Sequence, residues 1–212
     1  MLTAIVDYDS GNLHSAHKAF ERMAHETDAG DVIVTSDPET VLKADRVVLP
    51  GDGAFPACRT ALFDHKGIYE AIEELVIRRA RPFMGICIGM QMLATRGLEY
   101  EETAGFDWIK GSVRKITPSN ADLRVPHMGW NTLEIEQSHP LFDGISHGKH
   151  CYFVHSYHFD VDAPTERLAS TDHGGKITAV VGRDTLVGVQ FHPEKSQETG
   201  LRMIANFLKW RP

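Results

Sequence analysis

Cysteine is scarce in this sequence and lacks the spacing that would join cysteines to one another or to a metal. The 212 residues include three cysteines, Cys58, Cys87 and Cys151, and no C-x-x-C pair. An odd number of widely spaced cysteines indicates neither a disulfide framework nor a zinc knuckle, so three free thiols are expected. Twelve histidines occur without an H-E-x-x-H motif. No metal site is predicted, because a metal ion needs converging ligands.

Long apolar runs, an excess of basic charge and nucleotide-binding motifs are also missing. No apolar stretch approaches the roughly 20 residues of a membrane-spanning helix, and acidic residues outnumber basic ones by 29 to 22. Neither a membrane nor a nucleic acid is therefore an expected partner. There is no G-x-x-x-x-G-K-[ST] loop and no dinucleotide fingerprint, and no cofactor is expected. The N-terminal M-L-T-A-I-V-D-Y lacks the features of a signal peptide, so a cytoplasmic location is expected.

The first half of the chain alternates apolar strand patterns with helical ones. Strands are expected at residues 2–7, 31–35, 45–49 and from 82 onward, each followed by a helical pattern. The helix that begins near residue 55 reaches about Arg79, with an interruption near Lys66-Gly67. Such alternation predicts a parallel sheet with helices on both faces. Because ligands bind beyond the carboxyl ends of such strands, the loops after the first, third and fourth strands are predicted to converge on one crevice.

The second half changes character, because strand patterns follow one another with few helices between them. The expected strands cover residues 108–116, 129–136, 149–154, 167–170, 177–182 and 186–191. Gly174-Gly175 and Arg183-Asp184 fit hairpin turns, and a helix from residue 197 or 199 to Trp210 closes the chain. We predict one α/β domain over residues 1–212, with a central, mostly parallel sheet flanked by helices and antiparallel additions in its C-terminal half.

The turn after the fourth strand carries the motif G-I-C-I-G at Gly85–Gly89. This G-x-C-x-G pattern is the thiol form of a nucleophile elbow, in which flanking glycines permit a tight reversal that presents one side chain. Cys87 would then lie over the first helical turn, where unpaired N–H groups and the helix dipole stabilise a thiolate. The alternative is a buried, inert cysteine, so the hypothesis requires a base elsewhere in the chain.

A histidine and a carboxylate follow the last strand pattern, in the sequence His192-Pro193-Glu194. The proline stiffens the backbone between them, so Glu194 can hold one ring nitrogen and direct the other toward Cys87. An isolated H-P-E is typical of an ordinary strand-end turn. Together with the elbow cysteine, it predicts a Cys87, His192, Glu194 triad for acyl transfer.

Acyl transfer also needs backbone donors for an oxyanion. One is the N–H of Ile88, directly after the nucleophile. The other is expected from P-G-D-G at residues 50–53, where Gly51 and Gly53 permit close approach or rotation of a peptide on either side of Asp52. P-G-x-G is also a common turn, so this assignment depends on the triad.

G-I-C-I-G-M-Q with a distant F-H-P-E resembles the class I glutamine amidotransferases. The resemblance implies a flavodoxin-like core and hydrolysis of the side-chain amide of glutamine to glutamate and ammonia. More specific segments, spread over nearly the whole chain, resemble the glutaminase subunits of imidazole glycerol phosphate synthases. They are D-Y-D-S-G-N-L at 7–13, L-P-G-D-G-A-F at 49–55, V-P-H-M-G-W-N at 125–131, Y-F-V-H-S-Y at 152–157 and Q-F-H-P-E-K-S at 190–196.

This resemblance also implies a heterodimer with a cyclase subunit that is a (β/α)₈ barrel. In that family the cyclase uses the ammonia with a phosphoribulosyl formimino intermediate to make imidazole glycerol phosphate, for histidine, and an aminoimidazole carboxamide ribotide (AICAR). The implied interface residues are Trp130, Asn131 and Lys195. A core aromatic is the alternative for Trp130, but the neighbouring Gly129 and Asn131 favour an exposed anchor.

Within the site, the resemblance implies that Cys87 forms a glutamyl thioester, His192 moves the proton and Glu194 orients His192. The residues implied to hold glutamine are Gln91, Glu99, His155, Ser156 and Tyr157. Gln91 lies one helical turn after Cys87 and can face the same crevice, whereas no geometric argument from the sequence supports Glu99.

Asp52 departs from the family pattern, which usually has an apolar residue in this strand. Its side chain is expected to point outward, because the backbone is the part that acts on the substrate. The resemblance, together with the flexible glycines around Asp52, implies that this strand is held out of position until the cyclase has bound its substrate. The isolated glutaminase chain is therefore expected to turn over glutamine poorly.

Three other functions stay open at this point. Glutaminase subunits of anthranilate, aminodeoxychorismate or pyridoxal phosphate synthesis share the chemistry, but V-P-H-M-G-W-N and H-P-E-K-S argue against them. A thiol hydrolase of the dienelactone type also has an elbow cysteine, but it usually places its acid before the histidine in the chain. An inactive regulatory subunit is disfavoured, because all three triad residues are present.

Overall fold

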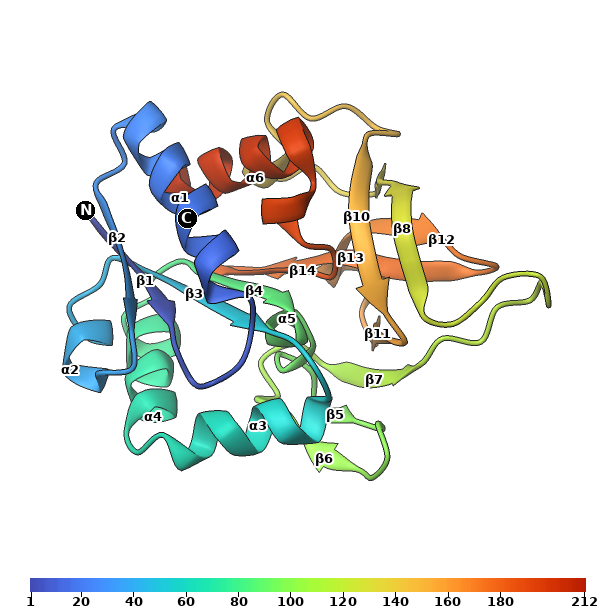
Figure 1. The fold of residues 1–212 in the computed structure, drawn as a ribbon, viewed down its shortest axis with the longest axis horizontal. Coiled ribbons are helices and arrows are strands. Elements are labelled where there is room, and N and C mark those ends of the chain that lie inside the picture. Colours follow the sequence, from blue (N-terminus) through green and yellow to red (C-terminus); the bar gives the residue numbers. More distant parts are fainter.

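The computed structural model describes residues 1–212 and contains three β-sheets (Figure 1). The largest sheet consists of β1 (Leu2–Val6), β2 (Asp31–Thr35), β3 (Arg46–Gly51), β4 (Phe83–Cys87), β9 (Glu134–Ile135), β12 (Arg167–Asp172), β13 (Lys176–Arg183) and β14 (Leu186–Val189). These eight strands lie in the order β2-β1-β3-β4-β14-β13-β12-β9. The order places strands from the two halves of the chain, β4 and β14, side by side.

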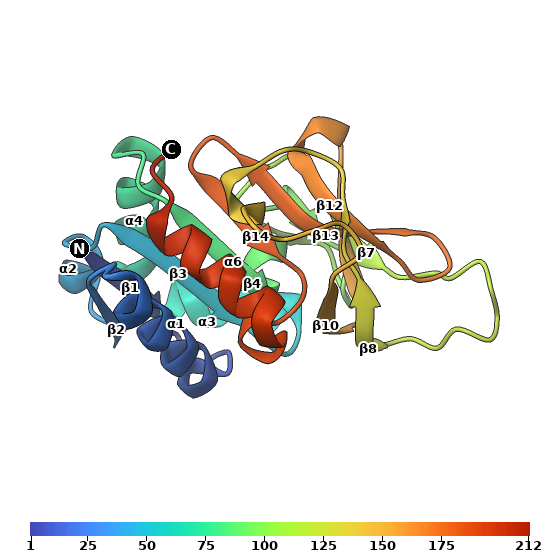
Figure 2. The same ribbon diagram turned by 90° about the horizontal axis from the view of Figure 1, so that it is seen from above.

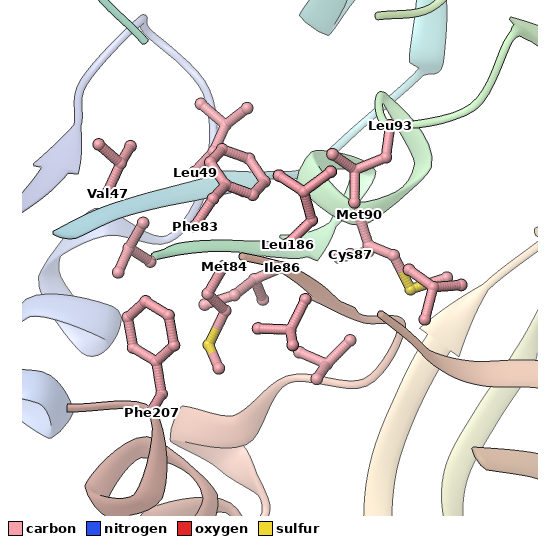
Figure 3. Close-up of a cluster of buried hydrophobic side chains, with 14 of the residues drawn as sticks. Val47, Leu49, Phe83, Met84, Ile86, Cys87, Met90, Leu93, Leu186 and Phe207 are labelled. Atoms are coloured by element: carbon pink, nitrogen blue, oxygen red, sulfur yellow. The ribbon is translucent and has the colours of Figure 1, made fainter. Parts of the chain in front are cut away.

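The strands β2, β1, β3 and β4 are parallel, as the alternation of strands and helices predicted. The strand β14 is also parallel to β4, so the expectation that it would be an antiparallel addition was wrong. Parallel strands covered on both faces bury side chains in both directions, and Val47, Val48 and Leu49 of β3 are fully buried. Figure 3 shows side chains of β3, β4 and β14, among them Leu49, Phe83 and Leu186, packed in one cluster. This apolar packing fixes the strand ends that carry the candidate active site.

Helices cover both faces of the parallel strands. They are α1 (Leu13–Thr27), α2 (Pro38–Val41), α3 (Phe55–Asp64), α4 (Ile68–Glu73) with its π-helical extension η1 (Glu74–Arg78), α5 (Ile88–Gln91) and α6 (Gln197–Lys209). The helices α1 and α6 pack on one face of the sheet, and α3 and α4 lie on the other (Figures 1 and 2). Gly67, at φ 85°, separates α3 from α4 and confirms the interruption predicted there.

The second half of the chain forms two further sheets. One contains β5 (Arg96–Gly97), β6 (Thr103–Ala104), β7 (Gly111–Lys115) and β11 (Tyr157–Val161), and the other contains β8 (His127–Thr132) and β10 (His150–His155). The strands β13, β12 and β9 extend the main sheet antiparallel to their neighbours, as predicted. The expectation that the other strands also add to that sheet was wrong, because a strand pattern specifies an extended segment but not its partner.

The strand predicted over residues 129–136 illustrates this point. It divides into β8 in the two-stranded sheet and β9 in the main sheet. Between them, Leu133 is fully buried and donates its N–H to the carbonyl oxygen of Lys149 at 2.7 Å. One continuous strand pattern in the sequence therefore forms strands in two different sheets.

Both predicted hairpin turns are present. Asp172 accepts hydrogen bonds from the N–H groups of Gly174 and Gly175 between β12 and β13, and Asp184, at φ 52°, turns β13 into β14. Three short 3₁₀ turns each begin with proline, at η2 (Pro140–Phe142), η3 (Pro164–Glu166) and η4 (Pro193–Lys195). None of the helices has the length and apolar character needed to cross a membrane.

Candidate active site

Cys87 is the last residue of β4, and α5 begins at the next residue, so the predicted elbow is a strand-to-helix turn. Its backbone has φ 55° and ψ −112°, a conformation that L-residues rarely adopt. Close contacts require the flanking glycines. A Cβ at Gly85 would lie 2.4 Å from the Gly89 carbonyl oxygen, and one at Gly89 would lie 1.8 Å from the Leu49 carbonyl oxygen. Tight packing therefore maintains the strained backbone conformation of Cys87.

The helix after the elbow is a single turn that ends at Gln91. After it, the N–H groups of Leu93 and Ala94 bond to the carbonyl groups three residues earlier, which is a 3₁₀ pattern. The carbonyl groups of Met92 and Leu93 then accept hydrogen bonds from the N–H groups of Phe106 and Trp108, so no further helical turn forms. So short a helix has a small macrodipole, and its contribution to the positive potential at Cys87 comes from the unpaired N–H groups of its first turn. The N–H of Ile88 is one of these groups.

His192 and Glu194 lie in the loop that follows β14. The Nδ1–H of His192 donates to Glu194 Oε1 at 2.9 Å, and both side chains are buried. The His192 N–H donates to the Tyr152 carbonyl oxygen, which ties the loop to β10. Burial lowers the pKa of His192, but its hydrogen bonds with Cys87 and Glu194 outweigh burial and raise the pKa to about 10. A protonated imidazole therefore faces the sulfur at neutral pH, which favours a thiolate.

Cys87 and His192 border a cavity of about 380 Å³ beyond the ends of β3 and β4. Eleven of the predicted site residues line it: Asp52, Gly53, Cys87, Ile88, Gln91, Glu99, His155, Ser156, Tyr157, His192 and Lys195. Two other lining residues, Pro126 and Val154, were not predicted. Gly51 and Glu194 lie behind the cavity, next to His192. Loops distant in the sequence thus converge on one crevice, as the strand order requires.

Gln91 and Glu99 each offer an acceptor in this cavity. Gln91 Nε2 donates to the Tyr157 carbonyl oxygen at 3.1 Å, while its buried Oε1 has no partner in the chain. Glu99, for which the sequence offered no geometric argument, follows the short strand β5 and reaches the cavity from there. Its Oε2 accepts from the Phe55 N–H at 2.8 Å at the start of α3. Two acceptors in one cavity suit a ligand with an ammonium or amide group.

The segment 50–53 is held by hydrogen bonds from the loop after β1. The hydroxyl of Tyr8 donates to the Pro50 carbonyl oxygen at 2.6 Å. The hydroxyl of Ser10 donates to the Asp52 carbonyl oxygen at 3.0 Å and accepts from the Asp52 N–H at 3.3 Å. The thiol of Cys58 also donates to the Asp52 carbonyl oxygen, at 2.9 Å. The Asp52 N–H is therefore engaged with Ser10 and is not free to bind an anion in the cavity.

The side chain of Asp52 is exposed and turned toward the same loop, where Oδ1 accepts from the Gly11 N–H at 3.1 Å. This geometry agrees with the outward orientation expected from the sequence. It directs the carboxylate oxygen at a backbone donor outside the elbow.

A chain of neutral histidines supports the cavity wall. His155 Nδ1 donates to the Tyr157 carbonyl oxygen at 2.8 Å, so its Nε2 accepts from His127 Nδ1, at 3.0 Å. His127 Nε2 in turn accepts from Asn131 Nδ2 at 3.1 Å. Burial lowers the pKa of His155 to about 3 and that of His127 to about 4, and neighbouring histidines add to the effect. Both rings are uncharged at neutral pH.

The predicted interface residues lie outside the cavity or at its edge. Trp130 of β8 is 48% exposed, and its ring packs edge-on against Tyr152. The Asn131 side chain is half-buried and donates inward, to His127 and to the Asp172 carbonyl oxygen. Lys195 is exposed and lines the cavity. Trp130 is thus not a core aromatic.

Gln190, which lies beside Cys87, was not among the predicted site residues. Gln190 is fully buried, and its Nε2 lies 3.7 Å from Cys87 Sγ. A single polar residue at the end of the apolar run L-V-G-V, shortly before the predicted base, was the available signal. No group of three or more His, Cys, Asp or Glu side chains is arranged to hold a metal ion.

Comparison with protein families identifies the lineage of this site. The family model described as glutamine amidotransferase class-I matches residues 4–210. The chain belongs to the class I glutamine amidotransferase family. The elbow cysteine and the histidine–glutamate pair are therefore found in a family that acts on glutamine.

Three curated proteins that are similar to this chain have the same name. The chain is 68% identical, over the full length of both chains, to the imidazole glycerol phosphate synthase subunit HisH of Ruegeria pomeroyi and to that of Cereibacter sphaeroides. It is 53% identical to the protein of the same name from Brucella abortus, again over the full length of both.

Solved structures share the fold at low identity. One is described as a glutamine amidotransferase, with a TM-score of 0.72 and 18% identity over 98% of this chain and 99% of that one. Another is a glutamine amidotransferase from Thermotoga maritima, with a TM-score of 0.63 and 17% identity over 95% of this chain and 80% of that one. These likenesses establish the class I amidotransferase fold.

Proposed function

We propose that the protein is the glutaminase subunit of imidazole glycerol phosphate synthase. It hydrolyses glutamine and delivers the ammonia to a cyclase subunit in histidine biosynthesis. The observation that carries this proposal is the His192–Glu194 hydrogen bond beside Cys87, on a cavity of about 380 Å³. Full-length relatives that are 68% identical and bear that name support it.

In the proposed acylation, the Cys87 thiolate attacks the side-chain carbonyl carbon of glutamine, and a C–S bond forms as the carbonyl oxygen becomes an oxyanion. His192 gives its Nε2 proton to the amide nitrogen as the C–N bond breaks. Ammonia leaves, and a γ-glutamyl thioester remains on Cys87. Glu194 keeps the Nδ1–H of His192 in place throughout, so the other nitrogen faces the reacting atoms.

In the proposed deacylation, neutral His192 takes a proton from a water molecule, whose oxygen attacks the thioester carbon. The C–S bond breaks, which restores the thiolate of Cys87 and the protonated His192. The product acid loses its proton to solvent as glutamate. Glu99 and the Oε1 of Gln91 are proposed to accept hydrogen bonds from the substrate's ammonium group, with the His155-Ser156-Tyr157 segment completing the pocket.

The proposed oxyanion site is incomplete in the lone chain. The Ile88 N–H is one donor, but the Asp52 N–H is occupied by Ser10 Oγ. Rotation of the peptide between Gly51 and Asp52 would release this N–H toward the cavity, and the glycines on both sides of Asp52 permit it. We therefore propose that the isolated chain turns over glutamine slowly and that the loaded partner promotes the rotation.

The proposed partner is a (β/α)₈-barrel cyclase, joined in a cytoplasmic heterodimer that acts as a lyase. Exposed Trp130, with Asn131 and Lys195, is proposed to contact it near the mouth of the cavity. A large aromatic exposed on a short antiparallel sheet is a common anchor of protein interfaces.

The deciding experiment measures glutamate release by the chain alone, with the cyclase, and with the cyclase and its substrate. The rate of glutamate release with the cyclase and its substrate is expected to exceed the rate of the chain alone by at least about 100-fold, because the loss of one oxyanion donor lowers the rate by about that factor. Labelling with a glutamine-analogue electrophile is expected to modify Cys87 alone. Absence of that label in the loaded complex would falsify the enzymatic proposal, and activation by a chorismate-using enzyme instead of the cyclase would overturn the choice of synthase.

A further inference from the structure

Gln190 lies beside Cys87 because of its position in the sheet. In the parallel pair β4 and β14, Val189 lies opposite Ile86, so the next residue on each chain, Gln190 and Cys87, are also neighbours. Neighbouring residues at the same register of a parallel pair point to the same face. The Gln190 side chain consequently reaches Cys87, with Nε2 to Sγ at 3.7 Å.

The direction of this hydrogen bond is fixed by a chain of donors that begins at the cavity wall. The Tyr157 carbonyl oxygen can only accept, so the Gln91 amide must direct its NH₂ group there, at 3.1 Å. The second hydrogen of that NH₂ goes to Gln190 Oε1, at 2.9 Å. With its oxygen accepting from Gln91, Gln190 has only its NH₂ group to offer to Cys87. The sulfur therefore receives a hydrogen-bond donor.

We propose that Gln190 is a further catalytic residue, whose side-chain NH₂ donates a hydrogen bond to the Cys87 thiolate and stabilises it. Gln190 is fully buried, so no water competes for the interaction, and a hydrogen bond to an ionised acceptor is stronger than one to a neutral group. Gln91 and Tyr157 are positioning residues, because they orient the Gln190 amide from the wall that contacts the substrate.

This inference rests on the proposed glutaminase chemistry and adds a specific consequence. The variant Gln190→Met removes the donor and keeps the length of the side chain. It raises the pH midpoint for alkylation of Cys87 by about one unit, which corresponds to about tenfold less thiolate at pH values below the midpoint. Gln190→Glu, which places a carboxylate there, raises the midpoint further. A purely structural role for Gln190 would lower stability without moving the midpoint.

The test measures the rate of Cys87 alkylation by iodoacetamide between about pH 5 and pH 10, resolved from Cys58 and Cys151 by peptide mass spectrometry. Thr178→Val is the matched control, since Thr178 is a buried polar residue in the adjacent strand β13 and its variant retains the wild-type midpoint. An unchanged midpoint in folded Gln190→Met overturns the proposal. If the midpoint of Gln190→Met is unchanged while Cys87 of the wild-type protein reacts with the glutamine analogue and glutamine is hydrolysed, the proposed role of Gln190 is wrong and the proposed glutaminase function stands.

A second measurement needs no variant at this position. In the wild-type chain, the side-chain NH₂ nuclear magnetic resonance signal of Gln190 is expected to shift with pH at the same midpoint as the alkylation rate. In Cys87→Ala this pH dependence is lost. A Gln190 signal that does not respond to pH in the wild-type protein overturns the hydrogen bond even if Gln190→Met fails to fold.

Discussion

The two walls of the cavity are built in different ways. The wall that carries Cys87 comes from parallel strands whose side chains are apolar and buried on both faces. The opposite wall comes from two- and four-stranded sheets, where His127 and His155 are buried and joined by hydrogen bonds. Apolar packing fixes the first wall rigidly, whereas the second depends on polar groups that must stay paired. In the proposed function, the catalytic side chains lie on the packed wall and, apart from Gln91 of α5, the glutamine-binding residues lie on the hydrogen-bonded one.

The largest expected effect tests whether the chemistry depends on the packed wall. Cys87→Ala is expected to reduce glutamate release by the loaded complex by at least about 10³-fold, because the nucleophile is lost. Thermal unfolding changes little, since Cys87 lies at the end of its strand. Cys151→Ala is the matched control, because Cys151 is fully buried on β10 and lies outside the cavity. Activity of Cys87→Ala within tenfold of wild type would contradict the assignment.

The rigidity of the packed wall is tested at its closest contact. Gly89→Ala is expected to lower the free energy of unfolding by more than about 3 kcal/mol, because the new Cβ meets the Leu49 carbonyl oxygen at 1.8 Å and both backbones are buried. Gly148→Ala, before β10, meets no atom within 4 Å, and only its φ of +80° opposes the substitution. Its cost is about 1 kcal/mol. Urea denaturation measures the free energy of unfolding of both variants. Equal losses of this free energy would remove the distinction between the rigidly packed wall and the hydrogen-bonded one.

A smaller effect is expected on the hydrogen-bonded side, at the exposed face of β8. Trp130→Ala is expected to raise the dissociation constant for the cyclase about 30-fold, or about 2 kcal/mol, with an unchanged unfolding temperature. Ile77, an exposed apolar residue of η1, gives the control Ile77→Ala, whose affinity stays within about threefold of wild type. Calorimetric titration decides the point. Unchanged affinity with lowered stability would make Trp130 a packing residue.

The smallest effect concerns the acid sensitivity of the histidine chain. The pKa of His127 is lowered to about 4 in the folded protein, chiefly by burial, so below about pH 6.5 the unfolded chain binds more protons. The stabilisation from neutral His127 is complete above pH 6.5 and is lost as the pH falls toward 4. At pH 5.5 the loss is about 1 kcal/mol. His127→Gln, which keeps an uncharged polar side chain, is expected to flatten this slope.

Denaturant unfolding at pH 7.5, 6.5 and 5.5 provides the measurement for that last prediction. The exposed His14 of α1 gives the matched control His14→Gln. A slope in His127→Gln as steep as that of the wild-type protein would show that His127 is not an acid-sensitive residue of this wall.

Sequence reasoning was most successful where local rules determine position. The glycines of G-I-C-I-G predicted a strand-to-helix turn, which the contacts of Gly85 and Gly89 explain. It was least successful for Glu99 and Gln190. Glu99 reaches the cavity because a two-residue strand, β5, joins a separate sheet, and Gln190 reaches Cys87 because β14 lies beside β4. Neither pairing can be derived from residue patterns alone.

By itself the sequence determined the alternation of strands and helices, the family, and the chemical groups available, since these depend on local periodicity and on residue type. Only the tertiary structure decided which groups meet. It gave the register that places Gln190 beside Cys87, the early end of α5, and the hydrogen bond that turns the Asp52 N–H toward Ser10. Contacts between distant segments depend on which strands pair, and strand pairing is settled by packing of the whole chain.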